Sequence, residues 1–258
     1  MDHRKKRRYI LRKQYRADLS FVIIYIFIIA VLVYTFLGIQ LKIWIFYGEK
    51  YCLLDCLHAL EKPYYFGITV LPLTLFGILS GRKVFTYPAF ILKYESCTKI
   101  WKLLLNSIVR RSVLFSVIFS STACLFSALS SYTVVNWREE SSMFYQITGT
   151  FYEGSAVYVI LLFFLFNSIK FCLAALCFTV LENLSGDSLW SVLFLTTVVT
   201  IEWVSEDTQI FLNLFAISQT HFKMLRHSVW ILLLGFGLLI ILYLGGKKIW
   251  KEKEFYGK

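Results

Sequence analysis

Six long apolar runs constrain the fold of this chain more than any other feature of its sequence. They lie at about residues 19–37, 64–80, 113–135, 156–181, 189–204 and 229–244. A helix needs about 20 mostly apolar residues to cross a hydrocarbon core of about 30 Å, and each run meets or approaches that length. Only helices and closed barrels satisfy their backbone groups in lipid, and these runs lack the alternation of barrel strands. We therefore predict an all-α fold, with residues 1–258 forming one polytopic transmembrane domain.

The cationic residues predict how the chain is oriented, because Lys and Arg near span ends favour the cytoplasmic side. If the N-terminus is cytoplasmic, twenty Lys and Arg residues fall in inner segments and six in outer segments. This bias predicts six spans with both termini in the cytoplasm. The basic segment 1–18 is expected to form an interfacial elbow helix, although a solvated charged tail stays open as an alternative, and residues 245–258 form a basic tail.

The net charge of +11 does not indicate a nucleic-acid partner. The basic residues cluster beside the span ends, and no nucleic-acid-binding motif accompanies them. Contacts with anionic membrane lipid explain them better. Membrane lipid is therefore an expected partner, and nucleic acid is not.

No catalytic or metal-binding pattern is present. The sequence contains no HExxH, GxSxG or P-loop motif and no pair of Asp residues within the spans, so neither enzymatic activity nor a cofactor is expected in this chain. Cys52, Asp55, Cys56 and His58 lie close together in the first outer segment, but no second ligand pair at zinc spacing completes a site. Metal binding is not predicted, whereas a bridge between Cys52 and Cys56 stays open.

Two ionisable residues lie within predicted spans, where a charge near the bilayer centre costs at least about 2.5 to 3.5 kcal/mol. They are Lys170 and Glu202, and their predicted levels in the membrane differ by about 15 Å, so direct pairing is not expected. Lys170 either snorkels inward or faces a polar cavity beside Asn167 and Ser168. Glu202 is expected at the outer mouth. These four residues are the candidates for a translocation pathway.

The cytoplasmic segment 81–111 carries the clearest family resemblance. Its residues LKYESCTKIWKLLLNSI resemble the loop between spans two and three of ABC-2 type transporter permeases, especially small six-span permeases of Gram-positive bacteria. A basic residue, Tyr, a variable position, Ser and a Lys/Trp-rich turn commonly precede the third span there. The matching positions are Lys93, Tyr94, Ser96, Lys99, Trp101 and Lys102. The resemblance implies that this segment is a coupling helix, with Tyr94 and Trp101 as its anchors on an ATPase.

The resemblance further implies a subunit of an ATP-driven exporter in a bacterial plasma membrane. Such a permease pairs with a second identical or homologous permease, and the pair docks on two cytosolic P-loop ATPase subunits that bind ATP and Mg. The apolar outer segment 205–228 is expected to be re-entrant or interfacial. The expected cargo is an amphipathic or antimicrobial peptide or a lipid-like compound. A stand-alone immunity protein against a bacteriocin, and an intramembrane enzyme, remain the alternatives.

Overall fold

The protein is described by a computed structural model that covers residues 3–48, 50–80, 82, 96–152, 154–205, 208–217 and 225–252, without the side chains of 3–18, 225 and 226. Within these residues it is helical and contains no strand, only an isolated bridge between Lys50 and Ser142. The prediction of an all-α fold is confirmed. The elements are α1 (His3–Phe46), α2 (Leu53–Leu60), α3 (Pro63–Tyr65), the π-helical turn η1 (Phe66–Val70), α4 (Leu71–Leu79), α6 (Cys97–Ser130), α7 (Met143–Thr148), α8 (Ala156–Ser185), α9 (Ser188–Val204) and α11 (Leu225–Glu252).

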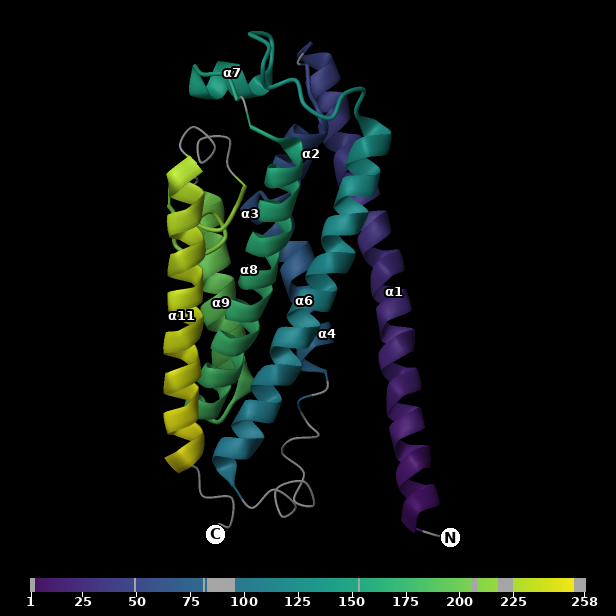
Figure 1. Ribbon diagram of the computed structural model, residues 1–258, viewed down its shortest axis with the longest axis vertical. Helices are drawn as coiled ribbons and strands as arrows, with labels where there is room; N and C mark the ends of the chain where they lie inside the picture. Colours follow the sequence, from purple (N-terminus) through teal and green to yellow (C-terminus); the bar gives the residue numbers. More distant parts are fainter. Residues whose placement is uncertain are drawn as a thin grey trace.

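The long helices run side by side and alternate in direction (Figure 1). The start of α1, the start of α6 and the end of α11 lie at one end of the bundle, which we call the basic end. Helices α2 and α7 lie at the opposite end, which we call the outer end.

Four helices in the described residues are long and apolar enough to cross a membrane: Leu19–Phe46, Cys97–Ser130, Ala156–Ser185 and His227–Glu252. A fifth crossing results if the bent pair Leu53–Leu60 and Pro63–Leu79, which turns by 53°, counts as one span. Helix α9 has 17 residues and so a length of about 26 Å, a little less than the hydrocarbon core. The chain is therefore membrane-embedded, and the sixth span remains a prediction.

Two helices extend well beyond the predicted spans. Residues 3–18 continue into the first span as the single helix α1, so they do not form a separate elbow helix. Helix α6 already begins at Cys97, within the predicted cytoplasmic segment. No Pro or Gly lies where either helix passes from the extension into the predicted span, so each helix continues unbroken.

Helix α8 forms the centre of the bundle. It packs against α4, α6, α9 and α11, and it is the most buried of the four long helices. Three buried serines of α6, Ser112, Ser116 and Ser120, lie one helical turn apart. Ser116 Oγ donates to the carbonyl oxygen of Phe164 at 2.9 Å. Small side chains of this kind allow close approach of helices in a membrane.

At the basic end, α11 packs closely on α6 at a position where only glycine leaves enough space. The Trp101 side chain is fully buried, and its Nε1 donates to the carbonyl oxygen of Tyr243 at 3.2 Å. A Cβ added at Gly246 would lie 2.3 Å from the Trp101 ring, whereas a Cβ at Gly245 would meet nothing within 4 Å.

We therefore expect Gly246→Ala to be clearly less stable than Gly245→Ala. Gly246→Ala overpacks the contact with Trp101 and should cost about 1 to 3 kcal/mol. Gly245→Ala should be neutral or stabilising by up to about 1 kcal/mol, because alanine favours the helix. Thermal unfolding of the two purified variants in detergent measures the difference. Equal stability of the two variants would contradict this packing.

Candidate functional site

A buried ion pair joins two distant parts of the chain, the middle of α8 and the end of α2. Lys170 Nζ on α8 lies 2.9 Å from Glu61 Oε1, which immediately follows α2, and neither side chain is exposed. The ammonium group also lies 3.9 Å from the centre of the Phe66 ring. Each charge is thus neutralised within the protein, as a low-dielectric surrounding requires.

The Glu61 carboxylate has two further donors. Asn167 Nδ2 donates to Oε1 at 2.9 Å, and the backbone N–H of Ile217 donates to Oε2. The carbonyl oxygen of Ile217 in turn lies 2.6 Å from His58 Nδ1. Since a carbonyl oxygen only accepts, His58 carries its proton on Nδ1. This network fastens segment 208–217 to both α2 and α8.

Glu202 holds the other end of the same segment. Its fully buried carboxylate accepts from the backbone N–H groups of Ile210, Phe211, Leu212 and Asn213, at 2.6 to 3.1 Å. A carboxylate satisfies the unpaired N–H groups of a tight turn in the way that an acidic residue caps a helix.

The structure thus places the four pathway candidates in packed surroundings. Lys170 neither snorkels nor faces an open cavity, because it pairs with Glu61, and Glu202 is bound to backbone N–H groups instead. Asn167 is fully buried, and Ser168 Oγ donates to the carbonyl oxygen of Phe164 within its own helix at 2.9 Å. We interpret the network of Lys170, Glu61, Asn167 and Glu202 as the structural anchor of the outer end, and a role in translocation stays a prediction.

The acidic side chain of α2 also has structural partners, and the two nearby thiols are buried. Asp55 accepts from Trp137 Nε1 at 2.8 Å and from the backbone N–H of Cys52 at 3.0 Å. Cys52 and Cys56 are buried free thiols. Within the described part of the chain, no three His, Cys, Asp or Glu residues are placed to hold a metal ion.

Three aromatic rings pack together at the outer end, and one of them, Trp137, bonds to Asp55 of α2. Trp137 stacks on Phe144 at 4.6 Å and meets Tyr152 edge-on at 5.4 Å. Burial raises the pKa of the Tyr152 phenol, and the neighbouring Tyr158 adds to the shift. This phenol therefore stays neutral at ordinary pH.

The expected coupling segment is only partly described. Lys93 and Tyr94 lie outside the described residues. Ser96 precedes α6 as its N-cap residue, and Lys99 and Lys102 are exposed on its first turns. Trp101 differs from the expectation of an exposed anchor, because α11 covers it completely. The apolar stripe of α6 includes Trp101, Leu104 and Ile108, and all three are buried.

A lateral groove of about 670 Å³ lies between α4 and α9. One wall is formed by η1 and α4, and the opposite wall by successive turns of α9. Its lining residues are Gly67, Ile68, Leu71, Pro72, Leu75, Phe76, Leu79, Ser80, Arg82, Phe178, Ser188, Val192, Leu195, Thr196, Val199 and Thr200. Most of these side chains are apolar. Ser80, Arg82 and Ser188 lie at the basic end, and Thr196 and Thr200 lie further along the α9 wall.

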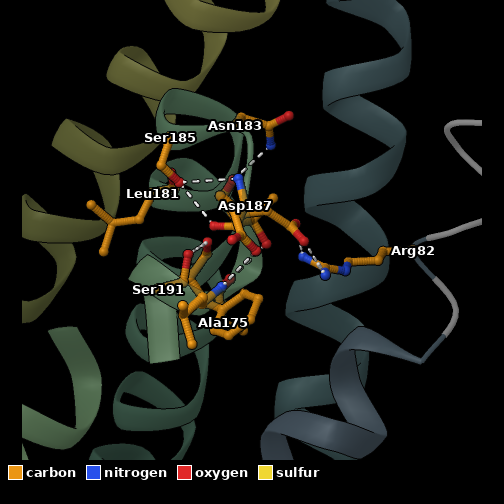
Figure 2. A network of polar contacts seen from close by, with 11 residues as sticks. Arg82, Ala175, Leu181, Asn183, Ser185, Asp187 and Ser191 are labelled. Carbon is orange, nitrogen blue, oxygen red and sulfur yellow. Dashed lines mark hydrogen bonds and ion pairs between the residues drawn. The ribbon is translucent and has the colours of Figure 1, made fainter. Parts of the chain in front are cut away.

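An ion pair closes the basic end of the groove. Arg82 makes a two-pronged contact with the Glu182 carboxylate, and its guanidinium lies 5.0 Å from the centre of the Phe178 ring. Figure 2 shows Arg82 reaching toward the turn between α8 and α9. The turn itself is well defined, since Gly186 has φ 77° and Asp187 Oδ1 accepts from the backbone N–H of Leu189 at 3.0 Å. Both features fix the position of Glu182.

Sequence reasoning missed Glu61, the Arg82–Glu182 pair and the groove. Glu61 stands in the apolar stretch CLHALEKPYYF, and an acidic residue there is a usable indication of burial. The other two depend on which helices are neighbours, which the sequence pattern does not give.

Comparisons of the chain with protein-family models, with curated proteins and with solved structures found no match. The site is therefore interpreted from the residues of this chain alone. The resemblance to ABC-2 permeases remains an expectation that rests on the sequence from Leu92 to Ile108 and on the order of the apolar runs.

The buried pair predicts that Lys170→Met destabilises the protein strongly. The substitution leaves Glu61 charged and without its counter-ion, at an expected cost of about 3 to 5 kcal/mol. Adding Glu61→Gln removes the lone charge and should restore a large part of the loss. The measurement is thermal unfolding of both variants in detergent.

Lys102→Met is the matched control, because it makes the same change at an exposed lysine and should leave stability unchanged within about 0.5 kcal/mol. A Lys170→Met variant as stable as this control would show that Lys170 is not ion-paired in the folded protein.

Proposed function

We propose that the chain is the permease subunit of an ATP-driven ABC exporter in a bacterial plasma membrane. It would have six spans and cytoplasmic termini, pair with a second permease subunit, and dock on two cytosolic P-loop ATPase subunits that bind ATP and Mg. Its cargo would be an amphipathic or antimicrobial peptide or a lipid-like compound.

The length and continuity of α6 are the observation that carries this proposal. Its 34 residues correspond to a length of about 51 Å, which exceeds the hydrocarbon core by about 20 Å. The excess lies at the basic end, where Lys99 and Lys102 are exposed. A force applied to this end acts directly on the membrane-embedded part, because the helix is continuous. An ATPase partner needs such a rigid lever.

The contact of α6 with α11 supports the same role. The buried Trp101 attaches the start of α6 to the end of α11. A force that the ATPase applies to the basic end would therefore act on both helices. The helices would then have two arrangements. ATP would favour one of them if the ATPase partner binds ATP more tightly when the helices are in that arrangement.

The dense packing around α8 supports a paired assembly. The polar side chains inside the bundle, among them Asn167, Lys170 and Glu202, are buried in packed contacts. A route for cargo through a single bundle would have to break these contacts. A pathway between two permease subunits avoids this cost.

The proposal predicts that reversing two charges at the start of α6 weakens the complex. Lys99→Glu with Lys102→Glu should reduce co-purification of a P-loop ATPase and should lower ATP hydrolysis by the purified complex, because both exposed charges face the expected docking side. The measurement is a pulldown of the tagged chain from its native membranes, with mass spectrometry and an ATPase assay of the bound fraction.

The matched control is Lys248→Glu with Lys251→Glu, which reverses two exposed charges at the end of α11. This control should retain the ATPase. If the unmodified chain retains no P-loop ATPase, the exporter proposal fails, and an immunity protein that works alone becomes the better hypothesis.

A further inference from the structure

We propose that the groove between α4 and α9 binds one acyl chain of a phospholipid, with the lipid phosphate at Arg82. This inference goes beyond the exporter proposal and does not depend on it, because binding is measured without an ATPase. It rests on the shape of the groove, on the chemistry of its walls and on the charged group at its basic end.

The dimensions of the groove fit a lipid chain. Its α4 wall runs from Gly67 to Ser80, or about 20 Å along the helix axis, slightly more than the roughly 15 Å depth of one leaflet. The groove has a volume of about 670 Å³ and is open to the side, so a flexible acyl chain can lie along it.

The walls offer an extended peptide few hydrogen-bonding partners. In an apolar surrounding, every backbone N–H and C=O group needs a partner. The hydroxyl groups on the α9 wall are already engaged within their own helix: Thr196 Oγ1 donates to the carbonyl oxygen of Val192 at 2.9 Å, and Thr200 Oγ1 to that of Thr196 at 2.8 Å. An acyl chain has no polar groups to satisfy.

The basic end supplies a site for the head group. The Arg82 side chain is 21% exposed, and its contact with Glu182 uses two of the five N–H donors of the guanidinium. The remaining donors suit a phosphate, which guanidinium binds with good geometry. Ser80 and Ser188 line the same end. The polar end and the apolar walls are arranged like the head and the tail of a phospholipid.

Two tryptophan substitutions on neighbouring residues of α9 test the acyl-chain site. Thr196 lines the groove and Thr197 does not, although both are exposed and both bond to a carbonyl oxygen of the preceding turn. Each variant is reconstituted in vesicles of phosphatidylethanolamine and phosphatidylglycerol, extracted in detergent and examined by native mass spectrometry for bound lipid. Thr196→Trp should reduce phospholipid retention about tenfold, whereas Thr197→Trp should retain as much as the unmodified protein.

Equal retention by the two variants would overturn the proposal. A peptide, or a second copy of the chain, that dissociates only from the Thr196→Trp variant would also overturn it, by identifying a different occupant.

Arg82→Met with Glu182→Gln tests the head-group site and leaves no lone charge in the protein. The unmodified protein should retain phospholipid about tenfold better than diacylglycerol, which has the same chains and no phosphate. The double variant should lose this preference, while Arg110→Met, which changes an exposed arginine outside the groove, should keep it. A preference unchanged in the double variant would show that Arg82 does not bind the phosphate.

Discussion

The buried pair of Glu61 and Lys170 is the interaction on which the outer end of this protein depends. Two charges placed among apolar helices are tolerated only when each has its counter-ion and its remaining hydrogen-bonding positions are filled. Here Asn167 and the backbone of Ile217 fill the positions on the carboxylate. The pair therefore fixes α2, α8 and the segment after α9 relative to one another. Glu202 fixes the same segment from its other side.

This arrangement divides the molecule into two halves with different characters. The outer half is held by buried carboxylates and by the aromatic cluster around Trp137. The basic half contains the long overhang of α6, the polar end of the groove between α4 and α9, and the partly exposed pair of Arg82 and Glu182. An exporter driven from the cytoplasm needs a firm outer half against which the basic half moves. The proposed function and the proposed lipid site both place their action at the basic half.

The sequence predicted the helical class and the positions of the main apolar helices, because about 20 consecutive apolar residues have few other solutions. It also identified Lys170 and Glu202 as exceptional, since charges are rare in such segments. It did not find their partners. The predicted spans placed Glu61 in the first outer segment. A stretch that bends back into the bundle has no simple sequence pattern, so its burial was not predicted. Trp101 was expected on an exposed face because the local helical pattern contains no information about α11, which covers it.

Hydrogen exchange of the unmodified protein in lipid nanodiscs tests the central claim most directly. The backbone N–H groups of Ile210, Phe211, Leu212, Asn213 and Ile217 donate to buried carboxylates, although their segment is not a regular helix. The account predicts that peptides covering 210–217 exchange as slowly as those of α8, because both belong to one stable unit. Exchange of 210–217 within seconds, as in an open loop, while α8 stays protected would contradict the claim that Glu61 and Glu202 anchor the outer end.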